Sequence, residues 1–365
     1  MTSTHTIEQP RLTKPQPVRC AAPLTKATTL AYLMFERPDL DLAETYLTSF
    51  GLRVTAREPD KLFLRGTAPS PYCYVVFKAA KPRFVGLAFT VPNAADLTKL
   101  SALPGASSIE AITWPGGGKR VQLRDPAGFR VDAVWGQQEV ETLPHRTPIR
   151  LNAPGELVRV DDPQRPPFDP PEVVKLGHVL IEVANFQAAS SWYTRNFGLI
   201  PSDVCVFPDG APGATFFRLD LGDQPADHHT LAMAQSFMAA YGHSAYELVD
   251  LDAIGVGQRL LQNAGWEHSW GIGRHMLGSQ VFDYWQDPWG DKHEHYCDGD
   301  VFTSATPTGV YPISREAMAQ WGPQMPKSFT KPHINLKTLT ALSRNLYGCE
   351  DLSIKRLKEL IKLFA

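Results

Sequence analysis

Residues 176–199 read LGHVLIEVANFQAASSWYTRNFGL, and the spacing of apolar residues changes along this stretch. Apolar and polar residues alternate over 177–183, which predicts a strand, and the residues that follow are typical of an amphipathic helix ended by Gly198. Residues 30–52, LAYLMFERPDLDLAETYLTSFGL, repeat the pattern of strand, helix and closing Phe-Gly-Leu. The chain is therefore predicted to contain an internal structural repeat.

The two halves of the chain also match at their ends. Residues 124–134 read RDPAGFRVDAV and residues 286–296 read QDPWGDKHEHY, so that each half has an Asp-Pro-X-Gly turn followed by a strand. Alternating strands at 84–91 and 242–249 begin a second unit in each half. Because short strands come in runs, we predict an α+β fold of four βαβββ modules, paired into two similar domains that each curve around a cavity.

Proline content divides the chain further. Four prolines in the first 23 positions disfavour regular structure there, and DDPQRPPFDPPE at 161–172 is typical of a linker. The final stretch DLSIKRLKELIKLFA has apolar residues at helical spacing, and we expect it to serve packing or oligomerisation. The predicted segments are an extended arm (1–27), an N-terminal domain of two modules (28–150), a proline-rich linker (151–171), a C-terminal domain of two modules (172–300) and a C-terminal tail (301–365).

The bulk composition narrows the class of protein. The chain has 365 residues, of which 43% are hydrophobic and 20% charged, and its formal net charge is -2. This balance gives no sign of a nucleic-acid or membrane partner. The five scattered cysteines form no CxxC pair, and the polar N-terminus lacks the apolar core of a secretion signal. We therefore expect a cytoplasmic protein.

Two histidines occupy equivalent places in successive predicted units. His178 shares a strand face with Glu182, and His243 has the same place in the next unit. Strand parity then allows either Glu294 or its neighbours His293 and His295 to face the cavity. Two histidines and one carboxylate form the facial triad of non-haem iron(II) oxygenases, and Mn(II) suits the same ligands. The alternatives are ordinary buried polar histidines and an exposed edge strand at 293–295.

These residues lie within longer motifs. DHHTLA at 227–232 and GIGRHMLGSQVFDYWQDPWGDKHEHYCDGD at 271–300 resemble the type I extradiol dioxygenases of the vicinal oxygen chelate superfamily, over about 28–320. His275, Tyr284 and Glu294 keep the spacing of that family's C-terminal signature. The resemblance implies that His178, His243 and Glu294 hold a mononuclear Fe(II).

The resemblance also implies an activity. A catechol-type ring would be opened next to its vicinal diol, with both atoms of O2 inserted, in a homo-oligomer. His229 matches the family's acid–base histidine, His275 a histidine near the deprotonated hydroxyl, and Tyr284 a tyrosine that hydrogen-bonds a substrate oxygen. The plainer alternatives are a supporting or solvated His229, a loop cap at His275 and a core tyrosine. We expect His228 to point away from His229, as on a strand.

The N-terminal half departs from this pattern. No histidine occurs near Ala31 or Gly86, which correspond to His178 and His243, and Asp132 falls opposite Glu294. This half is therefore expected to be a metal-free copy with a structural or subunit-contact role. The expected aromatic pocket walls are Phe186, Phe197, Phe207, Trp270, Phe282, Trp285 and Trp289.

Two other functions fit the same sequence. One is another metal-dependent enzyme of the superfamily, such as a glyoxalase-like isomerase or a lyase, which would not need His229, His275 and Tyr284. The other is a catalytically silent protein that binds an aromatic ligand.

Overall fold

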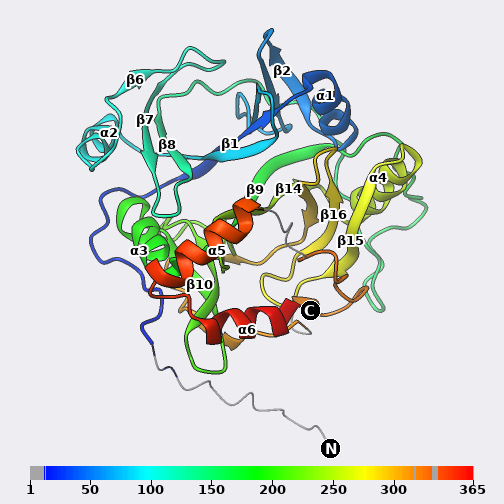
Figure 1. The fold of residues 1–365 in the computed structure, drawn as a ribbon. Coiled ribbons are helices and arrows are strands. Elements are labelled where there is room, and N and C mark those ends of the chain that lie inside the picture. The colour runs from blue at the N-terminus through cyan, green and yellow to red at the C-terminus, as the bar shows by residue number, and fades with distance from the viewer. Residues whose placement is uncertain (1–11, 13, 316–317, 331–335, 365) are drawn as a thin grey trace, which may run out of the picture.

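Two twisted β-sheets, each flanked by helices, make up the body of the protein (Figure 1). The structure, a computed structural model, describes residues 12, 14–315, 318–330 and 336–364. The elements of the first half are β1 (Thr29–Arg37), α1 (Leu40–Ser49), β2 (Arg53–Arg57), β3 (Lys61–Arg65), β4 (Tyr74–Lys78), β5 (Arg83–Thr90), α2 (Ala94–Ser101), β6 (Glu110–Ala111), β7 (Lys119–Arg124) and β8 (Arg130–Trp135).

The second half repeats this order with one added short strand, β12, and continues into a C-terminal segment. Its elements are β9 (Val173–Val183), α3 (Phe186–Phe197), β10 (Ile200–Val206), β11 (Pro212–Arg218), β12 (Ala226–Asp227), β13 (Leu231–Gln235), β14 (Ala240–Leu248), α4 (Leu251–Asn263), β15 (Glu267–Arg274), β16 (Val281–Gln286), β17 (Lys292–Cys297), β18 (Val301–Phe302), β19 (Gly309–Pro312), α5 (Leu336–Gly348) and α6 (Ile354–Phe364).

The strand order confirms four βαβββ modules. In the first sheet, ordered β2-β3-β4-β1-β5-β8-β7-β6, the leading strands β1 and β5 pair antiparallel at the centre. In the second sheet, ordered β15-β16-β17-β14-β9-β13-β11-β10-β19, β9 and β14 hold the same places. Each leading strand also pairs in parallel with the last strand of its own module. Strand β19 pairs in parallel with β10, so the second sheet extends past residue 300.

Local sequence sets the ends of these elements. Helix α3 ends at Gly198 with a φ of 67°, the left-handed cap that the sequence predicts. In the two Asp-Pro-X-Gly turns, the N–H groups of Gly128 and Gly290 donate to the carbonyls of Asp125 and Asp287, each at 2.9 Å. These glycines have φ values of 92° and 88°, a conformation that disfavours other residues. Each turn therefore returns the chain into β8 or β17.

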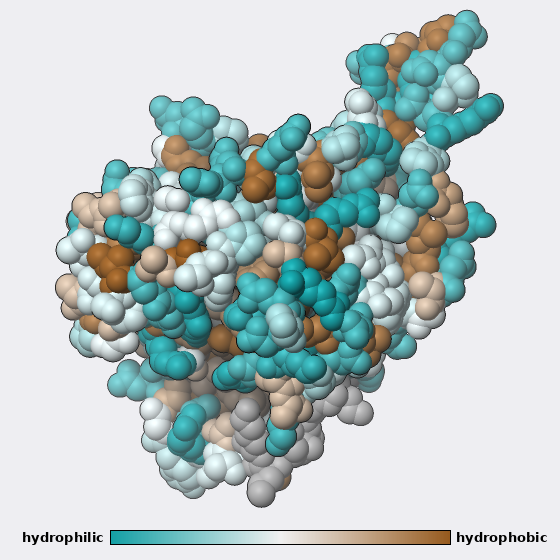
Figure 2. Space-filling view, turned by 90° about the horizontal axis from the view of Figure 1, so that it is seen from above, coloured by the Kyte–Doolittle hydropathy of each residue, from teal (hydrophilic) through white to brown (hydrophobic). Residues whose placement is uncertain are grey.

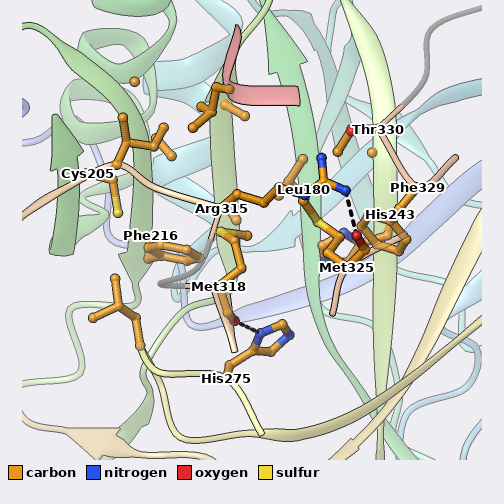
Figure 3. Close-up of a pocket in the computed structure, with 18 of the residues that line it drawn as sticks. Leu180, Cys205, Phe216, His243, His275, Arg315, Met318, Met325, Phe329 and Thr330 are labelled. Carbon is orange, nitrogen blue, oxygen red and sulfur yellow. Dashed lines mark hydrogen bonds between the residues drawn. The ribbon is translucent and has the colours of Figure 1, made fainter. Parts of the chain in front are cut away.

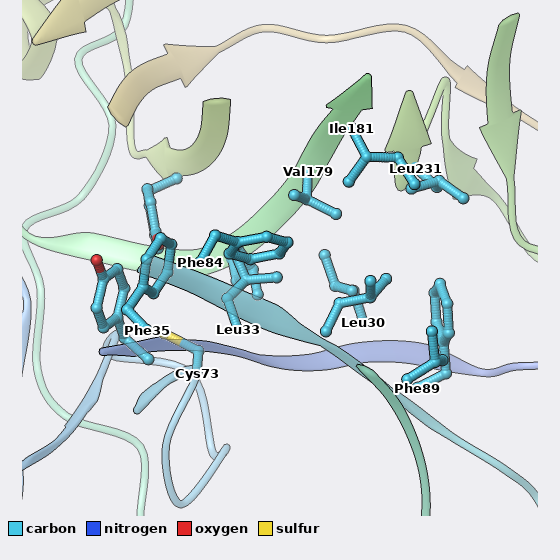
Figure 4. Close-up of a cluster of buried hydrophobic side chains, with 14 of the residues drawn as sticks. Leu30, Leu33, Phe35, Cys73, Phe84, Phe89, Val179, Ile181 and Leu231 are labelled. Atoms are coloured by element: carbon cyan, nitrogen blue, oxygen red, sulfur yellow. The ribbon is translucent and has the colours of Figure 1, made fainter. Parts of the chain in front are cut away.

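A single buried cluster joins the two sheets. Val179 and Ile181 on β9 belong to the same apolar cluster as Leu33 and Phe35 on β1 (Figure 4). Burial of this apolar surface stabilises the fold by about 25 cal/mol per Å². Because side chains alternate along a strand, one face of β9 is committed to this core and the other, with His178, faces elsewhere.

The predicted arm lies partly outside the described residues. Its described part, residues 12 and 14–27, is attached to α3, where Leu24 N–H donates to the Arg195 carbonyl at 2.7 Å. Residues 136–172 contain no helix or strand apart from one isolated bridge, and Arg146 in this stretch pairs with Asp250 at the start of α4. On the face in Figure 2, hydrophobic residues lie scattered among hydrophilic ones. None of the described helices combines the length and the apolar character that a membrane span requires.

Candidate active site

Three side chains from the central strands of the second sheet converge in its interior. The Nε2 atoms of His178 on β9 and His243 on β14 lie 3.2 Å apart. Each lies 3.3 Å from Oε2 of Glu294 on β17. All three residues are buried. In the strand register, Ala245 lies between His178 and Glu294, so a small side chain separates the two ligand positions.

Strand parity assigns the flanking histidines to the opposite face. His293 lies 3.1 Å from the Tyr74 hydroxyl, and His295 Nε2 donates to the Phe50 carbonyl at 2.7 Å while its ring stacks on Phe50. These partners belong to the N-terminal half. Glu294 is therefore the member of the His-Glu-His run that faces the two histidines of the site.

The donor atoms fit a divalent metal ion. Both carboxylate oxygens of Glu294 are buried without a hydrogen-bond partner. Burial would raise the pKa of Glu294, but the surrounding histidines, His178 first, hold it below its usual range. A buried, unbonded carboxylate anion requires a cation. Metal bonds of about 2.1 Å at about 90° place neighbouring donors about 3 Å apart, close to the spacing seen here. In the described residues this is the one group with metal-binding geometry.

The protonation state of His243 agrees with such a role. Burial lowers the pKa of His243 to about 3, against the opposing pull of Glu294. The ring is therefore neutral and offers a lone pair, as a metal ligand must.

His229 lies beside the three ligand positions. Its ring is 4.0 Å from the ring of His178, centre to centre. Burial first, and then the neighbouring histidines, hold the pKa of His229 well below its usual range. The expectation that His228 points away is wrong: residues 228–230 lie in a loop between β12 and β13, and the Nδ1 atoms of His228 and His229 are 3.0 Å apart. Strand parity does not apply in a loop.

His275 and Tyr284 form a pair on the other side of the site. Nε2 of His275 lies 2.9 Å from the Tyr284 hydroxyl and 3.6 Å from Oε1 of Glu294. Nδ1 of His275 lies 2.8 Å from the Met318 carbonyl. Because that carbonyl only accepts, Nδ1 of His275 carries a hydrogen and donates to it. With a hydrogen on Nδ1 alone, Nε2 is free to accept from the Tyr284 hydroxyl. Burial and Glu294 raise the pKa of Tyr284 well above its usual range, so the phenol keeps its proton.

A cavity of about 230 Å³ connects these groups. It is lined mostly by apolar side chains, and His243 and His275 are among the lining residues (Figure 3). Of the seven aromatic residues expected in its walls, Trp270 lines the cavity and the other six do not. One of these six, Phe282, lies directly behind the wall, where its ring stacks on His275. The other aromatic walls are Phe216, Tyr284, Tyr311 and Phe329.

The C-terminal segment supplies a wall that the sequence did not predict. Its cavity-lining residues include Ile313, Met318, Met325, Phe329, Leu360 and Leu363. Arg356 holds α6 in place through two contacts. Its guanidinium pairs with the Asp209 carboxylate at 2.8 Å and lies 3.8 Å from the centre of the Phe207 ring. The helical spacing in 354–364 predicts an apolar face, but no local signal tells which surface that face covers.

In the N-terminal half, the place of Glu294 holds Asp132. It accepts hydrogen bonds from Tyr32 at 2.9 Å and from Arg130 at 2.7 Å. An arginine thus compensates this buried carboxylate, and no metal-binding group is found among the described residues of this half.

Comparisons with known proteins agree with this geometry. Residues 175–294 match the family described as the glyoxalase/bleomycin resistance protein/dioxygenase superfamily. Metapyrocatechase 2 of Cupriavidus necator is 30% identical over 325 residues, which cover 85% of this chain and 94% of that protein.

Solved structures share the fold at low identity. A substrate complex of homoprotocatechuate 2,3-dioxygenase from Brevibacterium fuscum has a TM-score of 0.70 at 18% identity, covering 87% of this chain and 95% of that one. The Mn(II)-bound glyoxalase from Novosphingobium aromaticivorans has a TM-score of 0.70 at 19% identity, covering 91% and 99%. Given a metapyrocatechase relative along nearly its whole length, the chain belongs to the ring-cleaving extradiol dioxygenases of the vicinal oxygen chelate superfamily.

Proposed function

We propose that this protein opens a catechol-type ring beside its vicinal diol, inserts both atoms of O2, and uses a single Fe(II) held by His178, His243 and Glu294. The observation that carries the proposal is that His229, His275 and Tyr284 line the same cavity as His178 and His243, the two histidines of the buried triad. A glyoxalase-like isomerase or a silent binding protein needs no such second set of groups.

Held by His178, His243 and Glu294, Fe(II) would supply the Lewis-acid and redox chemistry of the reaction. His178 and His243 line the cavity, through which the catechol and O2 would reach the site. The mostly apolar lining excludes water and favours an aromatic ring over a polar substrate.

The three other residues would manage protons and orientation. His229 is neutral and buried, so it would take a proton from a catechol hydroxyl and return it when the ring opens. The Tyr284 hydroxyl and His275 would hydrogen-bond a substrate oxygen. In a water-poor pocket, such bonds stabilise developing charge more than they would in water.

Reconstitution under anaerobic conditions tests this function. The apoprotein is loaded with Fe(II), Mn(II) or Zn(II), given a panel of catechols, and then exposed to oxygen. We expect a yellow ring-fission product and one O2 consumed per catechol with Fe(II), and no product with redox-inert Zn(II). Absence of product and of oxygen uptake across the panel with both Fe(II) and Mn(II) would refute the proposal. A full rate with Mn(II) alone would correct the choice of metal.

The expected homo-oligomer stays a prediction. Size-exclusion chromatography with light scattering tests it.

A further inference from the structure

A buried chain of hydrogen bonds extends behind His229. Nδ1 of His229 lies 3.0 Å from Nδ1 of His228, and Nε2 of His228 lies 2.8 Å from Oδ2 of Asp203 on β10. His228 is 1%, His229 4% and Asp203 7% exposed, so water does not compete freely for these contacts.

The backbone around His228 and Asp203 leaves room for these hydrogen bonds. A Cβ atom at Gly278 would lie 2.9 Å from Nδ1 of His228, and one at Gly309 would lie 2.2 Å from Oδ1 of Asp203. Because neither position has a side chain, the backbone at Gly278 can lie close to His228 and the backbone at Gly309 close to Asp203. The His228 backbone is also held, because its N–H donates to the Asp300 carbonyl at 2.8 Å and its carbonyl accepts from Ser202 at 2.6 Å.

The Asp203 carboxylate at one end fixes the direction of each hydrogen bond in this series. A carboxylate only accepts, so Nε2 of His228 carries a hydrogen. In a neutral His228 ring, Nδ1 is then an acceptor, and Nδ1 of His229 must be the donor. The His228 ring is buried and packs against the rings of Phe216 and Phe302, which fix its orientation.

We propose that Asp203 and His228 are positioning residues that select the tautomer of His229, with the hydrogen on Nδ1 and a bare Nε2 lone pair facing the cavity. No protein partner for this Nε2 is found in the described part of the chain, and His229 lines the cavity. The lone pair is what a base needs to accept a proton from substrate, and a carboxylate behind a histidine is an established way to hold a tautomer. The inference rests on the proposed function of His229.

Spectroscopy tests the tautomer without activity. Two-bond proton–nitrogen correlation spectra of Zn(II)-loaded protein, labelled at histidine nitrogens, report which ring nitrogen carries hydrogen, and His229→Gln assigns the signal. We expect His229 to be protonated at Nδ1, and Asp203→Leu to shift it toward the Nε2–H form. A wild-type His229 with hydrogen on Nε2, or an Asp203→Leu spectrum identical to wild type, would overturn the proposal.

Kinetics of the Fe(II) enzyme test the consequence. His228→Leu removes the acceptor, whereas the side-chain oxygen of His228→Asn can take the place of ring Nδ1 and accept from His229. We expect His228→Leu to lower kcat about 10- to 100-fold with KM changed less than about threefold, and His228→Asn to regain most of the rate. Equal losses in both variants would contradict the proposal.

Asp220→Asn is the matched control, because Asp220 is a buried carboxylate of the same domain that pairs with Arg19 and Lys26 instead of a histidine. It should keep its kcat. If the wild-type protein opens no catechol, the proposed function fails, while the spectra still decide the tautomer.

Discussion

His178 and His243 direct their Nε2 atoms toward each other at 3.2 Å, from adjacent antiparallel strands that begin two successive modules. Two imidazole nitrogens brought this close from separate strands suit a shared cation, to which each ring can offer a lone pair. Glu294 completes the set at 3.3 Å from each.

Glu294→Ala should therefore lose metal. Removing the only anionic ligand of the triad should lower metal content by at least about 10-fold, measured by elemental analysis after dialysis. His293→Gln is the matched control, because the adjacent side chain faces the N-terminal half. A variant of Glu294 that holds metal as well as wild type would show that the triad is not the metal site.

His229→Ala should keep its metal and lose turnover. Loss of a general acid–base group typically costs 10²- to 10⁴-fold in rate, and we expect kcat to fall by about 10³-fold with Fe(II) content unchanged. Steady-state oxygen uptake measures it. Full activity in this variant would remove His229 from the mechanism.

Tyr284→Phe should act more mildly. The variant keeps the ring that packs against Trp270 but loses the hydroxyl that lies 2.9 Å from His275. We expect kcat/KM to fall about 10-fold, because the variant loses one hydrogen bond that contributes about 1.5 kcal/mol to binding of the transition state. An unchanged kcat/KM would mean that Tyr284 serves the core alone.

Leu360 on α6 should limit the size of the substrate. It lines the cavity and is 6% exposed, whereas its neighbour Ile361 is 59% exposed. Leu360→Trp should raise KM about 10-fold for catechols with bulky substituents and leave the KM of unsubstituted catechol nearly unchanged. Ile361→Trp should change neither value. Equal effects on small and bulky catechols would argue against α6 as a wall of the substrate site.

Asp125 should make stability depend on pH. Burial raises the pKa of Asp125 to about 6, above the 3.8 of an exposed carboxyl, although Tyr193 donates to it. A raised folded-state pKa means that the unfolded state releases this proton first, so stability falls as pH rises from about 4 to 6 and then levels off.

Asp125→Asn abolishes that titration and keeps an oxygen for the turn. The measurement is the free energy of unfolding in urea. We expect the value for Asp125→Asn minus the value for wild type to rise by about 1 kcal/mol between pH 5 and pH 8. A stability difference between variant and wild type that does not change with pH would show that the pKa of Asp125 is not raised.

Local sequence determined much of the fold. Alternation in 177–183, the Gly198 cap and the paired Asp-Pro-X-Gly turns are consequences of strand period and backbone conformation, which depend on near neighbours only. Parity within one strand likewise separates Glu294 from the two histidines beside it. The repeat of these signals was sufficient to predict four modules.

Only the tertiary structure decided which side chains far apart in the sequence come into contact. Asp203 and His228 are 25 residues apart and join through a loop, where no period relates one side chain to the next. The helix α6 has an apolar face, but its place over the cavity depends on Arg356 meeting Asp209, 147 residues away. Periodicity specifies which face of an element is buried; which surface buries it is determined by packing of the whole chain.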